Sequence, residues 1–360
     1  MAHDLALDLT IIGAGAVAAA TALAAAHYRV PFVQWMPATQ QPNSAKSGGR
    51  RYALSRSSVD FLQTMGVEFP TLPVEQFILH AGKRPLVLQE KNKPLCYMAA
   101  EEHLTQALEN ALQKINARRF SYQEMRYEKS DADAVQICID GTVQRSALLA
   151  VADGARSPLA TQIGIFSSVT DFHQQAVVAD VLAPQLPANS ASQWFADNDI
   201  VALLPAGAGV FSLVWSTAAA ESTLTPAELT TALCRRTGLT DIRITSAIRT
   251  FPLAAVRRSA RVAPRIALLG DAAAVVHPLA GQGLNLGLAD AKTLLQCVHR
   301  RIERNLSLGL AAYSRARTQR SNQLQQLTQF LLPQQRRVAC LLTAARLPLM
   351  RQLAIAGANY

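Results

Sequence analysis

The stretch DLTIIGAGAVAAATA, residues 8–22, joins a short apolar run to a turn with two glycines and then to a run of small residues. The apolar run has the character of a buried parallel strand, and the small residues suit a helix that packs closely against it. Gly13 would permit the tight turn, Gly15 would let a pyrophosphate approach the helix N-terminus, and Ala18 would leave room for packing. The stretch therefore predicts the start of a dinucleotide-binding fold, with a close-packing turn that binds no nucleotide as the alternative.

The second strand of such a fold is expected in RVPFVQW, residues 29–35, and it ends near Gln34. Dinucleotide-binding folds usually carry Asp or Glu at this position, where the carboxylate accepts hydrogen bonds from the ribose. The amide oxygen of Gln34 can accept the same bond, but without the charge that strengthens it. We therefore expect Gln34 to hold the ribose more weakly than a carboxylate would.

A second glycine-rich stretch, RIALLGDAAAVVHPLAGQGLNLGLADA at residues 265–291, repeats the order of strand, turn and helix. Asp271 follows the strand, where its carboxylate can accept hydrogen bonds from sugar-like hydroxyls. Gly281 and Gly283 lack side chains, so backbone N–H groups of this turn can approach a flat or anionic group. The helix that starts near Leu284 would direct its positive end at that group. A turn that serves only helix packing is the alternative.

The remaining patterns predict a discontinuous nucleotide-binding domain with a second domain inserted into it. Continuous apolar or alternating runs predict strands at residues 7–12, 30–35, 120–127, 134–140, 147–152 and 265–269. Helical patterns cover residues 16–27, 55–65 and 101–112, and alternating strands with one helix at 226–236 fill residues 174–251. We expect nucleotide-binding segments at 1–70, 96–172 and 256–300, inserted segments at 71–95 and 173–255, and basic C-terminal helices at 301–360.

The composition limits the classes of protein to which this chain can belong. With 360 residues, 50% of them hydrophobic and 17% charged, the chain is long enough for one large domain or two ordinary ones. The five cysteines lie far apart without a CxxC pair, which predicts core residues in a reducing compartment and no disulfide or metal site. Residues 9–26 are uncharged and largely apolar, but they lack a preceding basic segment and end in an alanine-rich run. We therefore expect no signal peptide and no transmembrane helix.

The net charge of +10 is concentrated near the C-terminus. Residues 291–360 contain eleven Lys or Arg and a single acid, Glu303. Such a segment indicates contact with an anionic surface such as lipid headgroups, or a helix face that is simply solvated. The sequence has no zinc-finger spacing, RNP-like aromatic pattern or clear helix-turn-helix, so nucleic acid is not an expected partner.

Three separated motifs together resemble the FAD-dependent group A aromatic hydroxylases. They are GAGAVA at residues 13–18, VADGARSPLATQIGI at 151–165 and the stretch at 265–291, in the order and spacing of that family. GGRRYALSRSSVDFLQTMG at 48–66 and ALLPAGAGVFSLVWS at 202–216 extend the similarity over nearly the whole chain. The branch that the chain resembles most is that of the ubiquinone-biosynthesis monooxygenases (the UbiH, UbiF, UbiI and Coq6 kind). The resemblance implies an α/β fold, with a Rossmann-like FAD-binding domain (GR2/PHBH-like), an inserted, mostly antiparallel β-sheet substrate domain and a C-terminal helical segment.

The resemblance also implies an FAD site built from all three motifs. The residues expected to bind the cofactor are Gly13, Gly15, Ala18, Gln34, Arg50, Asp153, Gly154, Asp271, Pro278, Gly281, Gln282, Gly283, Leu284 and Asn285. Asp271 would hold the ribityl and diphosphate portion, and residues 278–285 would wrap the isoalloxazine edge, where negative charge gathers on reduction. His277 and Pro278 are the catalytic candidates. His277 would assist proton movement near the flavin, and a hydrogen-bonded structural histidine is the alternative.

The implied reaction is hydroxylation of the ring of a polyprenyl phenol or quinone precursor by a flavin C4a-hydroperoxide, with NADH or NADPH as a transient reductant. The residues expected to line the substrate site, each also compatible with plain core, are Trp194, Phe195, Leu203, Pro205 and Trp215. Expected partners are the polyprenylated aromatic substrate, proteins of a ubiquinone-biosynthesis complex and, through the basic C-terminal segment, the membrane surface. The expected location is cytoplasmic, peripheral on the inner face of the membrane.

Two other functions stay open on the sequence. The chain could be a flavin hydroxylase of a soluble aromatic compound, or a catalytically inactive, flavoprotein-like scaffold of a biosynthetic complex. The scaffold alternative rests on two departures from the family pattern, Gln34 at the ribose position and Ala274 where the family usually has histidine. Tight binding of FAD would argue against the scaffold.

Overall fold

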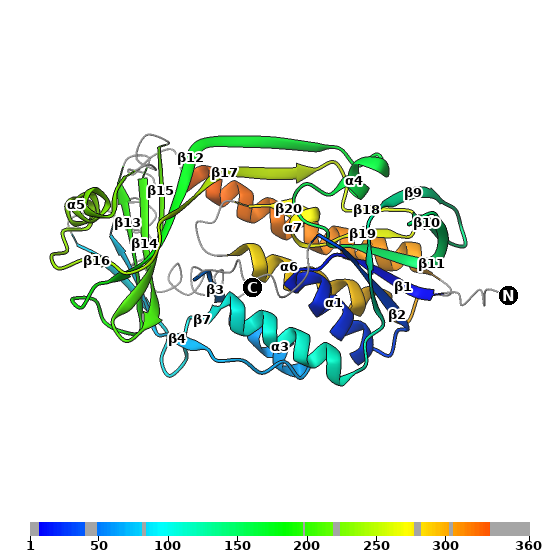
Figure 1. Cartoon of the computed structure of the whole chain (residues 1–360), viewed down its shortest axis with the longest axis horizontal. Coiled ribbons are helices and arrows are strands. Elements are labelled where there is room, and N and C mark those ends of the chain that lie inside the picture. Colours follow the sequence, from blue (N-terminus) through cyan, green and yellow to red (C-terminus); the bar gives the residue numbers. More distant parts are fainter. Residues whose placement is uncertain are drawn as a thin grey trace.

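The computed structural model describes residues 7–39, 49–80, 84–196, 199–218, 224–276, 282–301 and 305–331. These residues form two lobes, each built on its own sheet. The long strands β12 (Ser167–Leu182) and β17 (Arg249–Arg258) run from one lobe to the other (Figure 1). The three glycine-bearing motifs belong to the first lobe, so this lobe contains the expected nucleotide site.

The first sheet has a parallel centre, as the continuous apolar runs predict. β1 (Leu7–Ile12) lies between β2 (Phe32–Pro37) and β11 (Thr142–Val151), and β11 also pairs in parallel with β19 (Ile266–Leu268). The other strands of this sheet are β8 (Arg119–Tyr122), β9 (Met125–Ser130), β10 (Val135–Ile139) and β18 (Val262–Ala263). Because parallel strands end at the same edge, the turns after β1, β11 and β19 meet there.

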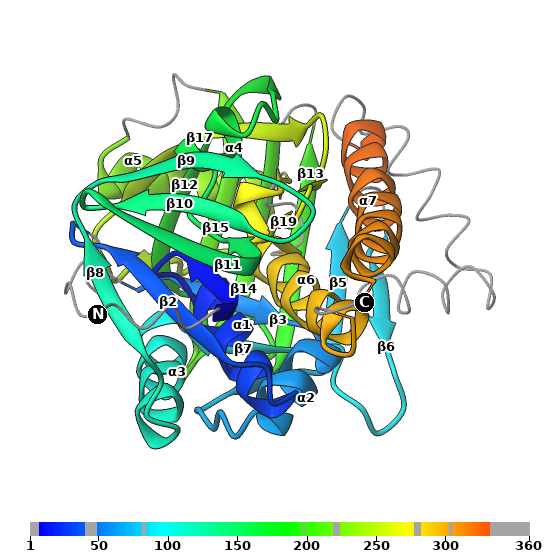
Figure 2. The same cartoon turned by 90° about the vertical axis from the view of Figure 1, so that its right-hand side faces the viewer.

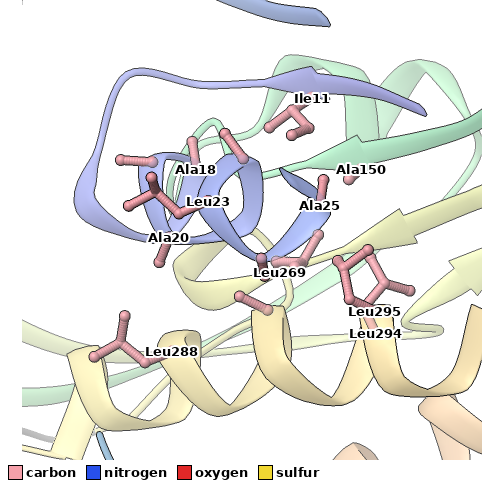
Figure 3. Close-up of a cluster of buried hydrophobic side chains, with 14 of the residues drawn as sticks. Ile11, Ala18, Ala20, Leu23, Ala25, Ala150, Leu269, Leu288, Leu294 and Leu295 are labelled. Carbon is pink, nitrogen blue, oxygen red and sulfur yellow. The ribbon is translucent and has the colours of Figure 1, made fainter. Parts of the chain in front are cut away.

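The helix α1 (Ala16–His27) is buried between this sheet and α6 (Gln282–Val298) because its small residues allow close approach. Figure 3 shows Leu288, Leu294 and Leu295 of α6 facing the alanine-rich helix. Val17 of α1 packs so tightly on α6 that a Cβ atom at Gly287 would lie 2.4 Å from its Cγ2. This contact requires glycine at 287. On its other side α1 contacts α3 (Glu101–Lys114).

The second lobe is built on a mostly antiparallel sheet of nine strands. Its strands are β5 (Gln76–His80), β6 (Leu86–Gln89), β12, β13 (Ser190–Ala196), β14 (Asp199–Gly207), β15 (Val210–Ala218), β16 (Arg243–Ile244), β17 and β20 (Ala274–Val275). The helix α5 (Pro226–Thr237), whose N-terminus has a capping box between Thr225 and Glu228, covers one face. The opposite face meets a small sheet of β3 (Arg51–Leu54), β4 (Leu72–Val74) and β7 (Cys96–Ala100).

The helix α7 (Leu306–Leu331) runs beside α6 (Figure 2). Its residues Leu306, Leu310 and Tyr313 are buried against the core of the first lobe. Across the described ranges, no helix combines the length and apolar character that a membrane span requires.

Two of the strands that differ from the sequence expectation have a clear physical reason. The single strand expected at 120–127 is two strands, β8 and β9, because the Asp140 carboxylate accepts hydrogen bonds from the amides of Gln123 and Glu124 and fixes a turn there. The antiparallel region begins at Ser167, earlier than the expected residue 174, because β12 extends back toward the first lobe to pair with β17.

Candidate functional site

The first turn of the site follows β1 and shows why two glycines stand there. Gly13 has a φ of +135°, and a Cβ atom on it would lie 2.2 Å from the carbonyl oxygen of Ala152, so only glycine fits. Gly15, the N-cap residue of α1, has ordinary extended backbone, and a Cβ on it would meet no described atom within 4 Å. Fully buried Ala18 packs beneath the turn. Packing therefore requires Gly13, while the position of Gly15 leaves open space at the helix N-terminus.

That helix N-terminus can still accept an anionic group. No side chain caps α1, and its first turn carries no acidic residue. The free N–H groups and the helix dipole favour a negative charge in front of such an end. Together with the space beside Gly15, this geometry matches the predicted pyrophosphate position.

Gln34 of β2 is fully buried next to this turn. Its Nε2 donates a hydrogen bond to the carbonyl of Gly13 at 2.8 Å, which fixes the orientation of the amide. Its Oε1 is buried and has no hydrogen-bond partner among the described residues. A buried acceptor without a partner costs free energy, and a ribose hydroxyl is a donor that would satisfy it.

Asp153 and Gly154 form the loop after β11, against the first turn. Within the described ranges, neither carboxylate oxygen of Asp153 has a partner in hydrogen-bond geometry, although both are buried. Burial raises the pKa of the Asp153 carboxyl, and the nearby Ser157 and Arg258 oppose this shift. The space beside Gly154 is open, so this loop has both an acceptor and room for a ligand.

Arg258 is a site residue that the sequence did not identify. Its Nε donates to the carbonyl of Ala272 at 3.1 Å, and its Nη2 donates to the carbonyl of Ala155 at 2.9 Å. One side chain on β17 therefore joins the loop after β11 to the turn after β19. Its position depends on the pairing of β17 with β12, which leaves no local sequence signal.

Asp271 follows β19, and the structure brings it near Arg50. Asp271 is exposed in the protein chain, yet neighbouring protein atoms remove enough hydration to raise the pKa of its carboxyl; Arg50 lowers the pKa, and Asp290 raises it. The Arg50 guanidinium lies 5.1 Å from the ring centroid of Tyr52, whose hydroxyl donates to Glu101 at 2.6 Å. Arg50 is exposed, so its charge is available to a ligand held by Asp271.

The N-terminus of α6 contains the remaining candidates. Asn285 is 1% exposed; its Oδ1 accepts from the amide of Ser55 at 2.9 Å, and its Nδ2 donates to the carbonyl of Ala53 at 2.8 Å. The side chain thus joins α6 to β3 and α2 (Arg56–Thr64), and only its backbone can face a flavin. Gln282 accepts from Asn285 at 3.3 Å, Leu284 packs against the core, and Gly283 has open space beside it. His277, Pro278 and Gly281 lie outside the described residues.

The residues expected to line a substrate site divide between the two faces of the second sheet. Trp194, Leu203 and Trp215 lie in the cluster beneath α5, with Leu229 and Leu233, so they form the core of this lobe. Pro205 is buried and pairs with Phe211 of the same cluster.

Alternate residues of these strands point to the opposite face, toward the first lobe. Leu204 packs there against the cluster that contains Met98 of β7, and half-buried Phe195 is on the same side as Ala191, which belongs to that cluster. Three half-buried neighbours lie on this face and were not predicted from the sequence: Val178, Ala202 and Val214. The alternation of side chains along the strands could be predicted from the sequence, but the face of the sheet that α5 covers could not.

The geometry fits a dinucleotide cofactor. The turns are close together: a Cβ atom on Gly13 would overlap Ala152, and Cβ atoms on Gly270 and Gly287 would both lie against Val17. The converging region offers an uncapped helix N-terminus, the partnerless Oε1 of Gln34, the buried carboxylate of Asp153, and Asp271 beside Arg50. This set of groups suits pyrophosphate, ribose and ribityl hydroxyls.

Comparisons of sequence agree with this assignment. The model of the FAD binding domain family matches residues 7–328. The chain is 30% identical over 315 residues to the ubiquinone hydroxylase UbiL of Rhodospirillum rubrum, covering 81% of this chain and 72% of that protein. It is 29% identical over 307 residues to the 3-demethoxyubiquinol 3-hydroxylase of Escherichia coli, covering 80% of this chain and 78% of that protein.

Comparisons of structure give the same fold. The p-nitrophenol 4-monooxygenase PnpA of Pseudomonas putida superposes with a TM-score of 0.75 at 17% identity, over 98% of each chain. The flavin-dependent brominase Bmp2 superposes with a TM-score of 0.79 at 13% identity, over 98% of this chain and 93% of that one. Because the family model matches most of the chain, the protein belongs to the FAD binding domain family of flavin-dependent monooxygenases, and FAD is its cofactor.

Proposed function

We propose that this protein hydroxylates the aromatic ring of a polyprenyl phenol or quinone precursor in ubiquinone biosynthesis. The proposal rests on the half-buried apolar face of the second sheet, which is turned toward the lobe that contains the three FAD motifs. The names of the ubiquinone hydroxylase relatives support the substrate class.

Bound FAD supplies the activation of oxygen in this reaction. Gly13 permits the tight turn, Gly15 leaves the α1 N-terminus accessible to the pyrophosphate, and Gln34 offers its Oε1 to the ribose. Asp271 and Arg50 would hold the ribityl and diphosphate portion from the other side. An apolar ring would rest against Val214 and Leu204, and these apolar side chains would exclude water from the reacting atoms.

The basic C-terminal part supports contact with an anionic membrane surface as part of this proposal. Arg300, Arg301 and Arg315 are exposed, whereas Arg317 is buried and its charge pairs with Asp290. A surface contact would give access to a substrate dissolved in the bilayer. Within this proposal the protein works in the cytoplasm, at the inner face of the membrane, beside other enzymes of ubiquinone biosynthesis.

The test is turnover of the FAD-loaded protein with a polyprenylated phenol in detergent micelles, with NADH or NADPH and ¹⁸O₂. We expect one labelled oxygen atom on the ring, detected by mass spectrometry. Higher kcat/KM with water-soluble phenols would replace this function with that of a hydroxylase for soluble aromatics. Binding of FAD without turnover of either class would support the scaffold role.

A further inference from the structure

One buried carboxylate connects three parts of the first lobe. Asp290 of α6 is 1% exposed, and its Oδ2 accepts a hydrogen bond from the amide of Gly270 at 2.9 Å. Its Oδ1 accepts from Nε of Arg317 on α7 at 2.7 Å. Nη1 of Arg261 lies 3.4 and 3.3 Å from the two oxygens. Asp290 thereby joins α6, α7 and the turn that carries Asp271.

The helix α7 makes further polar contacts with the same strand and its neighbours. The hydroxyl of Tyr313 donates to the carbonyl of Leu268, the last residue of β19, at 2.6 Å. Ser321 hydrogen-bonds to Arg261, whose carbonyl accepts from the amide of Leu268 at 2.9 Å. The end of β19 is therefore held from α7 at more than one point.

The charged contacts of Asp290 contribute more to the orientation of the turn at Gly270 than to the stability of the fold. A buried ion pair gains little net free energy compared with apolar packing, because both charges lose their hydration. A charged acceptor, however, makes a stronger and more directional bond to an N–H group than a neutral one. Here that bond goes to Gly270, which has a φ of +57° and directly precedes Asp271.

We propose that Asp290, oriented by Arg317, is a positioning residue for FAD. It fixes the turn at residues 270–272 so that Asp271 faces the cofactor. In consequence α7 contributes to the FAD site indirectly, through its contacts with α6, with β19 and with Arg261. FAD affinity is measured without substrate, so this role of Asp290 is tested independently of the proposed reaction.

The test compares FAD dissociation constants after the holoprotein has been stripped and titrated with FAD by fluorescence. We expect Asp290→Asn and Arg317→Gln each to raise the Kd about tenfold, since each weakens a charge-assisted bond that sets the turn. Arg317→Lys keeps the cation and should recover most of the affinity. The visible absorption band of the bound flavin should shift in Asp290→Asn and in Arg317→Gln, and should keep its wild-type position in Arg317→Lys.

The second lobe provides a matched control. Asp199 is also buried, pairs with Arg236 at 2.6 Å and accepts from Thr217 at 2.9 Å, but it lies on β14 away from the FAD motifs. Asp199→Asn should lower the Tm without changing the Kd for FAD. An unchanged Kd in Asp290→Asn, together with a lower Tm, would overturn the proposal.

If Arg317→Gln does not fold, Tyr313→Phe is the second variant, because it removes only one hydroxyl. We expect its Kd for FAD to rise about threefold, and no rise would equally overturn the proposal.

Discussion

At the scale of single residues, the two glycines of the first turn have separate reasons for being glycine. The backbone of Gly13 has positive φ and no room for a side chain, whereas that of Gly15 is ordinary and faces open space. The requirement at 13 comes from the protein, and we propose that the requirement at 15 comes from the pyrophosphate of the cofactor. Gln34 shows the same division within one side chain, with Nε2 bound to the protein and Oε1 left without a partner among the described residues.

Substitution of each glycine by alanine separates these two requirements. Gly13→Ala should lower the free energy of unfolding by more than about 2 kcal/mol, because the backbone is strained and the Cβ overlaps Ala152. Gly15→Ala should leave it within about 0.5 kcal/mol and raise the Kd for FAD about tenfold, because the methyl group occupies the pyrophosphate position. Chemical denaturation and FAD titration measure the two effects. Wild-type FAD affinity in Gly15→Ala would show that the space beside residue 15 is not the cofactor position.

At the scale of elements, adjacent residues of the strand β15 divide between core packing and the proposed substrate contact. Trp215 is fully buried beneath α5, and Val214 is half-buried on the face turned toward the first lobe. The difference follows from the two-residue period of a strand. The same period holds for β14, where Leu203 and Leu204 divide in the same way.

Two substitutions on β15 should therefore have opposite effects. Trp215→Leu should lower the free energy of unfolding by about 2–4 kcal/mol, because it leaves a cavity, while KM for the aromatic substrate stays the same. Val214→Phe should raise KM or lower kcat/KM, because it enlarges a side chain at the proposed ring position, with only a small change in Tm. Thermal denaturation and steady-state kinetics on both variants provide the measurement. A change of KM in Trp215→Leu with none in Val214→Phe would place the substrate elsewhere.

The elements that carry local signals were predictable from the sequence, and those held by distant contacts were not. The β1–α1 turn, the loop after β11 and the stretch around Asp271 each have a recognisable pattern, and the family spacing implied that they converge. Arg258 and Asp290 had no such pattern, because their roles depend on strand register and on the docking of α7. Among the expected substrate residues, Trp194, Leu203 and Trp215 are core, since the sequence does not tell which face of a sheet a helix will cover.

At the scale of the whole molecule, charge is distributed unevenly between interior and surface. Arg317 contributes to the basic count of the C-terminal part but is buried in the pair with Asp290. Arg300, Arg301 and Arg315 are exposed near the start of that part and on α7. Only exposed charges attract an anionic surface, and each adds about 1 kcal/mol near such a surface.

Cosedimentation with vesicles tests this contact. The protein should bind vesicles that contain anionic lipid more tightly than neutral ones, and added salt should weaken the binding. The triple change of Arg300, Arg301 and Arg315 to Gln should weaken it by roughly two orders of magnitude. The same change at Arg118, Arg126 and Arg145, which are exposed on the first sheet and its margins, is the charge-matched control and should have little effect. Equal binding to neutral and anionic vesicles would contradict the membrane proposal.

The long strand β12 has a mechanical consequence for the two lobes. It pairs with β17 in both lobes, and the pairing is interrupted once, between Asp171 and Gln174, where His173 has a φ of +53°. A hydrogen-bonded ladder resists shear along its length but bends where a bulge breaks it. The strand pair therefore bends near residue 173, between the two lobes. A change in the angle between them would alter the distance from the second sheet to the FAD motifs without sliding one past the other.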